Sequence, residues 1–168
     1  GEPSVYYTLL DGIKKAHRHL PVFSTIQYEH LRGIETESKN NKDFQIPGVM
    51  QLMKHSDYLA LSTYRYGLLH PNPASKTYFD AALSFNRPIA ISETGAMSET
   101  TKISGLSLTS NEDTQNEFIE MILQNAVKHE FPFVINWVGI DFDPMISKLG
   151  SRGEIAKAWV HTGMLTYR

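Results

Sequence analysis

Residues 87–95 read Arg-Pro-Ile-Ala-Ile-Ser-Glu-Thr-Gly. A continuous apolar run follows Pro88 and ends on a glutamate, Glu93, and Gly95 lets the backbone turn away after it. Strands that are covered on both faces read this way, because neither face needs polar side chains. We therefore predict a buried strand of a parallel sheet over residues 88–92, with the Glu93 carboxylate at its carboxyl end.

Three further runs share this pattern, over residues 21–26, 57–63 and 132–137. Each opens with Pro or Asp, and the starts of the four runs are 36, 31 and 44 residues apart. Apolar residues at helical spacing precede every run; they are Val5, Leu9, Ile13 and Ala16, then Ile46, Val49, Met50 and Met53, then Tyr78, Ala82 and Phe85, and finally Phe118, Ile119, Ile122 and Ala126. The predicted order alternates helix and strand four times, which indicates an α/β fold with parallel crossovers.

Local signals refine the helix starts and the loops. Pro47 suits the first turn of the helix before the second strand, and residues 110–113 resemble a capping box before the last helix. Two polar stretches, residues 32–45 and 99–111, follow the first and third strands and are expected to be loops. Both loops leave the carboxyl edge of the sheet, where α/β folds place their sites. An equal alternative is that both are solvated surface loops without a role in a site.

The composition excludes several classes of protein. The 168-residue chain has 16 Lys+Arg against 18 Asp+Glu, a net charge of −2 and no cysteine. A disulfide scaffold, a cysteine zinc site and a thiol nucleophile are therefore excluded. No run approaches the roughly 20 apolar residues of a membrane helix, and no basic run favours nucleic acid. We expect neither a membrane nor a nucleic acid as partner.

Cofactor motifs are also missing from the sequence. Neither a Gly-x-Gly-x-x-Gly loop nor a P-loop occurs, and the seven histidines show no paired spacing of metal ligands. We therefore expect no cofactor and no metal.

The strand ends bring together groups that suit a sugar ring. The second strand ends near Tyr64, the fourth ends on Trp137, and the first runs into a polar cluster that contains Gln27 and His30. A sugar stacks its C–H face on an indole, while its hydroxyls need fixed donors and acceptors beside the Glu93 carboxylate. The alternatives are a capping or ion-paired role for Glu93. Asp141, after Trp137, suits either a sugar hydroxyl or a loop turn.

At these residues the chain resembles the second half of a clan A retaining glycoside hydrolase, a (β/α)8 barrel. The stretch DYLALSTY is similar to strand 6 of that clan, RPIAISETG to strand 7, FPFVINW to strand 8, and AWVHTGML to the segment after strand 8. Within the clan, strands 6 and 7 look nearest to the endo-β-1,4-galactanase family, although β-1,3-glucanase-like and mannanase-like families also show a Glu-Thr-Gly or similar turn. The resemblance implies a half barrel of about four strands, with residues 1–168 as a single partial domain cut at both ends.

The resemblance also implies roles for individual residues. Glu93 maps onto the nucleophile, Tyr64 onto the tyrosine that hydrogen-bonds it, and Trp137 onto the floor of the sugar subsite. Glu2 maps onto the acid/base and lies 91 residues before Glu93, with Gly1 in place of the asparagine that the clan has there. Such a pair of carboxylates acts by double displacement when about 5–5.5 Å separate them.

These expectations define the predicted function. The chain is expected to derive from a retaining glycosidase that cleaves β-glycosidic bonds in an oligo- or polysaccharide such as galactan. The family resemblance also implies that the protein is secreted or periplasmic. The fragment alone need not be active. Two alternatives are a non-catalytic half barrel that binds carbohydrate or assembles, and a doubly wound domain in which Glu93 is structural. Open sheet edges would favour a homodimer.

Overall fold

The chain folds around a four-stranded parallel sheet. The computed structural model describes residues 3–32, 41–64, 77–103, 105–150 and 153–165. The sheet has the order β1-β2-β3-β6, with all three neighbouring pairs parallel; the strands are β1 (Thr25–Gln27), β2 (Leu59–Tyr64), β3 (Ile89–Gly95) and β6 (Val134–Asn136). The predicted α/β fold class is therefore confirmed, and the strands lie in the sheet in the order in which they follow along the chain.

The two central strands are buried and the two edge strands are short. Leu59, Ala60 and Leu61 of β2 are fully buried, as the continuous apolar pattern predicts. At the edges, the predicted runs 21–26 and 132–137 shrink to three-residue strands, each with one neighbour. A single neighbour supplies fewer ladder hydrogen bonds, so the first residues of each run stay outside the sheet.

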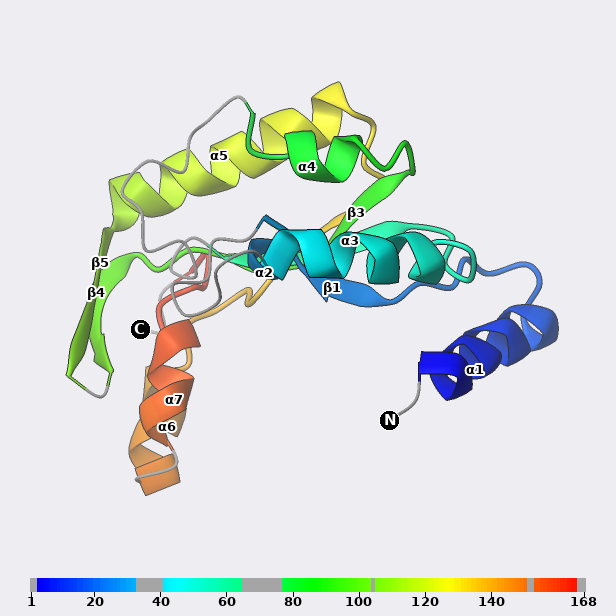
Figure 1. Cartoon of the computed structure of the whole chain (residues 1–168). Coiled ribbons are helices and arrows are strands. Elements are labelled where there is room, and N and C mark those ends of the chain that lie inside the picture. Colours follow the sequence, from blue (N-terminus) through cyan, green and yellow to red (C-terminus); the bar gives the residue numbers. More distant parts are fainter. Residues whose placement is uncertain (1–2, 33–40, 65–76, 104, 151–152, 166–168) are drawn as a thin grey trace.

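Helices precede each strand of the sheet in the predicted places, and Figure 1 shows α4 and α5 running together along one side of it. The helices are α1 (Pro3–Ala16), α2 (Tyr28–Arg32), α3 (Asn41–Leu52), α4 (Asp80–Leu83), α5 (Glu112–Lys128), α6 (Asp143–Leu149), α7 (Gly153–Ala156) and the 3-10 helix η3 (Lys157–Trp159). Across the described ranges, no helix combines the length and apolar character needed to cross a bilayer.

The hydrophobic core lies between the sheet and helices α2 to α5. Leu59 and Leu61 of β2 and Ile89 and Ile91 of β3 point to this side, where Phe118 of α5 is fully buried among them. Alternation along a strand then sends Ala60, Ser62 and Tyr64 to the opposite side. The predicted site residues are expected on this opposite side of the sheet, away from helices α2 to α5.

Residues 99–111 form a hairpin instead of the predicted loop. Strands β4 (Glu99–Ile103) and β5 (Leu106–Asn111) pair antiparallel, and Gly105 at φ +85° makes the turn. The threonines and serines that suggested a loop are β-compatible, and the Thr100 hydroxyl group bonds to the Ser110 backbone across the pair. Residues 33–40 of the other predicted loop lie outside the described part of the chain, and α3 already begins at Asn41.

Two predicted helix signals are also corrected. Pro47 lies inside α3, not in its first turn, because the helix begins six residues earlier. At α5 the N-cap is Asn111, whose Oδ1 accepts from the Thr114 amide at 2.8 Å. The Ser110 hydroxyl instead donates to the Met97 carbonyl, so the N-cap lies one residue after the position that the predicted capping box required.

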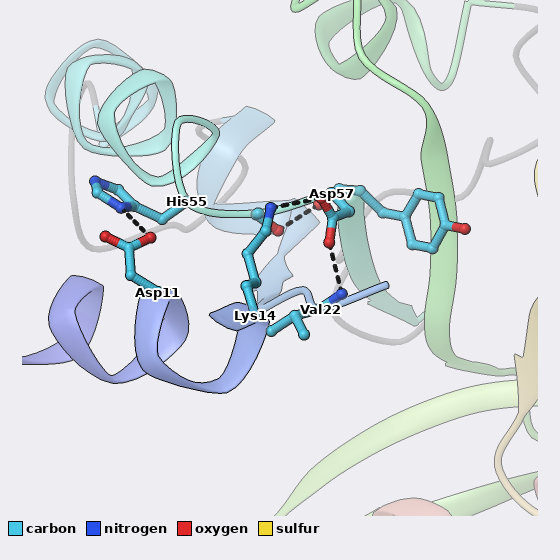
Figure 2. Close-up of polar contacts among 7 residues, drawn as sticks. Asp11, Lys14, Val22, His55 and Asp57 are labelled. Atoms are coloured by element: carbon cyan, nitrogen blue, oxygen red, sulfur yellow. Dashed lines mark hydrogen bonds and ion pairs between the residues drawn. The ribbon is translucent and has the colours of Figure 1, made fainter. Parts of the chain in front are cut away.

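Helix α1 lies apart from the other helices in Figure 1, and polar contacts attach it to the segment before β2 (Figure 2). Lys14 Nζ lies 2.5 Å from Asp57 Oδ1, the Val22 amide donates to Asp57 Oδ2 at 2.7 Å, and Asp11 contacts His55 at 2.9 Å. Burial raises the pKa of Asp57, but the bonds from Lys14 and Val22 outweigh it and hold that pKa below its usual range. Asp57 therefore links α1, the approach to β1 and the start of β2.

Candidate functional site

The carboxyl edge of the sheet brings three of the predicted residues onto adjacent strands. Tyr64 ends β2, Glu93 lies near the end of β3, and Trp137 follows directly after β6. Tyr64 is the register partner of Gly95, and the Trp137 amide donates to the Thr94 carbonyl at 2.7 Å. The three side chains therefore come from neighbouring positions at one end of a parallel sheet, where α/β folds build their sites.

A β-bulge decides the direction of Glu93. Simple alternation along β3 would place Glu93 on the same side as Ile89 and Ile91, inside the helical core. The register shifts at this point: Leu61 pairs with Ile91, but Ser62 pairs with Glu93. The extra residue turns Glu93 to the side of the sheet that carries Tyr64, as bulges beside functional sites commonly do.

Tyr64 and Glu93 form a direct hydrogen bond. The Tyr64 hydroxyl group donates to Glu93 Oε1, with the Tyr64 ring buried and Glu93 half-buried. Burial, followed by the Glu93 carboxylate, raises the pKa of Tyr64 well above its ordinary value of 10.0. Tyr64 therefore keeps its proton at neutral pH and acts as a fixed donor to one carboxylate oxygen.

Trp159 is a member of this cluster that the sequence did not reveal. The side chain of Trp159 hydrogen-bonds to the Tyr64 hydroxyl group, and this bond lowers the pKa of Tyr64. The indole N–H can only donate, so the Tyr64 oxygen is the acceptor. In the sequence, Ile155, Ala158 and Trp159 lie at helical spacing, a pattern that predicts packing. The segment AWVHTGML, similar to the stretch after the last strand of the family barrel, was the available signal.

Trp137 presents an open aromatic surface beside this pair. Its side chain is 46% exposed, and the peptide bond to Val138 is cis. Gly95 permits the close approach of the two strand ends, since a Cβ there would lie 2.8 Å from the Trp137 carbonyl oxygen and 3.2 Å from Tyr64 Cε1. An exposed indole at the end of the strand that neighbours the Glu93 strand suits the arrangement that a sugar ring needs.

Asp141 lies in a structural loop. Its residue is 4% exposed, and its Oδ1 accepts from the Gly163 amide at 2.8 Å. The Asp141 amide in turn donates to the Leu165 carbonyl at 2.9 Å. Of the two roles that the sequence suggested for Asp141, these contacts correspond to the one in a loop turn and not to the binding of a sugar hydroxyl group.

A buried carboxylate, Glu29, lies in α2 directly after β1, within the polar cluster that the sequence indicated there. Glu29 is 2% exposed, and its Oε1 accepts from the Thr63 hydroxyl at 2.6 Å and the Tyr64 amide at 3.0 Å. Glu29 therefore positions the end of β2, and with it Tyr64. Its neighbours Gln27 and His30 are exposed and half-buried respectively, and Gln27 pairs in register with Ser62.

Glu2 lies outside the described residues, so its predicted position opposite Glu93 stays a prediction. Within the described ranges, no group of three or more His, Asp or Glu side chains could hold a metal ion.

A large apolar pocket lies away from the sheet edge. It measures about 430 Å³ and opens between helices α2, α3 and α4; its lining is Leu31, Ile46, Met50, Met53, Ala81, Ser84, Phe85 and Arg87. None of the predicted site residues lines it. Because Leu31 and Met53 belong to the helix-side core, this pocket is on the opposite side from Tyr64 and Glu93.

Comparison with solved structures finds the same fold in an enzyme. The chain superposes on an active-site mutant of a Rhizomucor miehei beta-1,3-glucanosyltransferase, solved in complex with laminaritriose, with a TM-score of 0.64 and 15% identity. The match covers 99% of this chain and 54% of that chain, so the present chain spans about half the length of the structure it matches. At this identity the likeness shows the fold alone. It confirms a partial α/β barrel.

Sequence comparisons add nothing to this likeness. No family model matches the chain, and no curated protein sequence matches it either. The nearness to galactanases therefore stays a prediction.

Proposed function

We propose that this chain is the part of a retaining glycoside-processing enzyme that carries the nucleophile, Glu93. The observation that carries the proposal is the hydrogen bond from the Tyr64 hydroxyl group to Glu93 Oε1 at the carboxyl edge of a parallel barrel sheet. A buried donor on one oxygen orients the carboxylate and leaves Oε2 for attack. The structural likeness to a glucanosyltransferase supports the same class of chemistry.

The reaction would proceed by double displacement. A Glu93 oxygen forms a bond to the anomeric carbon while the glycosidic C–O bond breaks, and the leaving oxygen takes a proton from an acid. Water, or the hydroxyl group of a second sugar, then attacks the anomeric carbon, gives its proton to the acid that lost one in the first step, and releases the Glu93 carboxylate. Water gives hydrolysis, and a sugar hydroxyl gives transfer. Glu2 remains our candidate for the acid, by its resemblance to the family motif.

Trp137 would supply the apolar half of the recognition. Its indole is 46% exposed beside Glu93 and would stack on the C–H face of the sugar, while the exposed side chain of Gln27 would contact hydroxyl groups. We place the substrate among oligo- and polysaccharides with β-linkages. Galactan follows from the sequence resemblance, and β-1,3-glucan follows from the structural neighbour, which is bound to laminaritriose.

Covalent labelling tests the nucleophile without relying on the acid. Dinitrophenyl 2-deoxy-2-fluoro-β-glycosides of galactose and glucose have a leaving group that departs as the anion with the bonding electron pair, so it needs no proton. The full chain should release one equivalent of dinitrophenolate and gain the mass of one fluorosugar on the peptide that contains Glu93. Glu93→Gln should abolish both signals, whereas Glu117→Gln, an exposed carboxylate on α5, should retain them.

The outcomes separate the two functional classes. Labelling at another residue, or unchanged labelling of Glu93→Gln, would reject Glu93 as the nucleophile. Binding of galactan or laminarin without any labelling would favour the alternative, a carbohydrate-binding half barrel.

A further inference from the structure

The side of the sheet that carries Glu93 is concave, and we call it the inner face. Ile26 packs against the helical core, so its neighbours Thr25 and Gln27 point to the inner face. The Thr25 hydroxyl group lies 2.9 Å from the Ser92 hydroxyl group of β3, although β2 runs between these two strands. In a flat sheet two strand spacings, about 10 Å, would separate the two backbones, a gap that these short side chains cannot bridge. The sheet therefore curls around the inner face.

An aromatic cluster lies at the amino end of the inner face. Its members are Phe23, Tyr58 and Phe133, whose ring centroids lie 5.4, 5.9 and 6.0 Å from one another. Phe23 precedes β1 and Phe133 precedes β6, the two edges of the described sheet, so this contact also requires the curvature. Side chains thus occupy the amino end of the inner face, and its polar groups lie towards the carboxyl end.

Three polar residues form a row across the carboxyl end of the inner face. Ser62 of β2 is the register partner of Gln27 on one side and of Glu93 on the other. One strand spacing, about 4.8 Å, therefore separates the backbones of Ser62 and Glu93. Trp137 follows β6, the strand on the other side of β3. Glu93 is thus bordered by a polar flank on β2 and β1 and by an aromatic flank at the end of β6.

The Ser62 hydroxyl group is open to a ligand. The other serine and threonine hydroxyl groups of this face bond within the protein: Thr25 bonds to Ser92, and Ser92 also donates to the Leu61 carbonyl at 3.2 Å. Ser62 is half-buried, and its hydroxyl group has no hydrogen-bond partner within the described part of the chain. A hydroxyl group that is partly withdrawn from water and lacks a protein partner gains free energy when a ligand bonds to it.

We propose that Ser62 is a specificity-determining residue, which bonds to one hydroxyl group of the sugar held at Glu93. It rests on the proposed function, because it takes Glu93 as the residue that attacks the anomeric carbon. The C2 hydroxyl group adjoins that carbon, whereas Ser62 is a full strand spacing from Glu93, so the contact falls on the hydroxyl group at C3, C4 or C6. Gln27, whose exposed amide can donate and accept, is a second contact further from the reacting carbon.

A hydrogen-bonding residue at this position would select among sugars more strongly than Trp137 does. Epimers such as glucose and galactose differ only in the direction of one hydroxyl group, and an apolar surface separates such compounds weakly. A group that bonds to a sugar hydroxyl group loses its partner when that hydroxyl group is absent or points elsewhere. Ser62 therefore favours a sugar whose hydroxyl group on the β2 side is free of further substitution.

Paired changes in the protein and in the sugar test this contact. The probes are the dinitrophenyl 2-deoxy-2-fluoro-β-glycoside that labels the full chain fastest and its analogues without the hydroxyl group at C3, C4 or C6. Ser62→Ala should slow labelling by the parent glycoside about 3- to 10-fold. With one analogue, Ser62→Ala and the wild type should react at the same rate, because the bond is already lost. Ser107→Ala, an exposed serine on β5, should match the wild type with every probe.

Calorimetric titration of the full chain carrying Glu93→Gln measures the same contact without reaction. The probes are β-1,4-galactotriose and laminaritriose. The trisaccharide that binds more tightly should lose about 3- to 10-fold in affinity when Ser62→Ala is added, and adding Ser107→Ala should leave its affinity unchanged. Thermal unfolding of each variant establishes that the fold is intact.

The outcomes distinguish failure of this contact from failure of the proposed nucleophile. Labelling at Glu93 that Ser62→Ala slows equally for all probes would show a structural role for Ser62 and overturn the contact alone. Unchanged labelling and affinity in Ser62→Ala would do the same. Trisaccharide binding that weakens in Ser62→Ala, in a chain that is never labelled, would support the contact and reject the nucleophile. Absence of both labelling and binding would reject both.

Discussion

At the scale of single residues, the candidate site depends on groups that fix one carboxylate. Glu93 accepts a hydrogen bond from the Tyr64 hydroxyl group. The Tyr64 oxygen accepts a hydrogen bond from Trp159, and the Tyr64 amide donates one to Glu29. Each of these side chains comes from a different part of the sequence. The orientation of Glu93 is therefore set by contacts made around it.

The Tyr64 hydroxyl group is expected to matter for reactivity more than for stability. Tyr64→Phe removes a hydrogen bond to a charged group, so the rate of fluorosugar labelling should fall about 10- to 100-fold. Tyr58→Phe, a matched change at the other end of β2, should leave the rate unchanged. An unaltered labelling rate in Tyr64→Phe would show that the hydrogen bond does not serve the reaction.

The raised pKa of Tyr64 predicts a loss of stability in alkali. The unfolded chain releases this proton near pH 10.0, whereas the folded chain holds it to higher pH because burial and Glu93 disfavour the phenolate. Unfolding therefore becomes easier as the pH rises above about 10. In denaturant titrations between pH 8 and 11, the free energy of unfolding should fall less steeply with pH for Tyr64→Phe than for the wild type. The same pH dependence in both proteins would contradict the raised pKa of Tyr64.

At the scale of secondary-structure elements, close backbone contacts join the ends of strands and loops. A Cβ on Gly163 would lie 2.5 Å from the Asp141 amide nitrogen and 2.6 Å from Asp141 Oδ1. Similar crowding at Gly95 involves the Trp137 carbonyl. The segments after β6 and after η3 are therefore packed backbone against backbone, with the Asp141 carboxylate as their polar link.

Gly163→Ala should destabilise this junction. The added methyl group forces the Asp141 loop to move, at a cost of about 1–3 kcal/mol in the free energy of unfolding. Urea denaturation measures the change, and Gly139→Ala, outside the helices and strands where a Cβ would meet nothing within 4 Å, is the control. A stability of Gly163→Ala equal to that of the wild type would refute the proposed packing of Asp141.

The attachment of α1 should depend on Lys14. Lys14→Ala removes the 2.5 Å contact with Asp57, so hydrogen exchange in residues 3–16 should accelerate. Lys15→Ala removes a neighbouring positive charge and is the matched control. Because the pKa of Asp57 is lowered in the folded chain, its stabilising contribution is present above about pH 4 and is lost as the pH falls through the folded pKa. Equal exchange in both variants would contradict this attachment.

At the scale of the whole molecule, the side of the sheet opposite the helical core carries exposed apolar groups. Ile135 is 50% exposed and Trp137 is 46% exposed, and β1 and β6 are the edges of the described sheet. Helix α1 adds a stripe at four-residue spacing, Val5, Leu9 and Ile13, with exposed fractions of 69%, 56% and 38%. Such apolar faces and unpaired edges favour association with another polypeptide.

We therefore predict that the 168-residue chain self-associates at micromolar concentration, as a homodimer that covers these faces. Light scattering coupled to size exclusion should give at least twice the 19.0 kDa of one chain. Leu9→Glu should shift the population towards monomer, because it places a charge in the apolar stripe. Leu123→Glu, on the exposed side of α5, is the control. A stable monomer would contradict the prediction.

The sequence by itself determined the parallel sheet and the position of Glu93 at a strand end. These features follow from local patterns, because a strand covered on both faces must be continuously apolar and its end then carries the first polar group. Edge strand lengths and the 99–111 hairpin were less predictable, since they depend on neighbours and on pairing.

The chemistry of the site was decided by tertiary structure. A bulge between β2 and β3 turned Glu93 out of the core towards Tyr64, and η3 brought Trp159 to Tyr64 from 95 positions further along the chain. Such contacts depend on register and long-range packing, which no local pattern encodes.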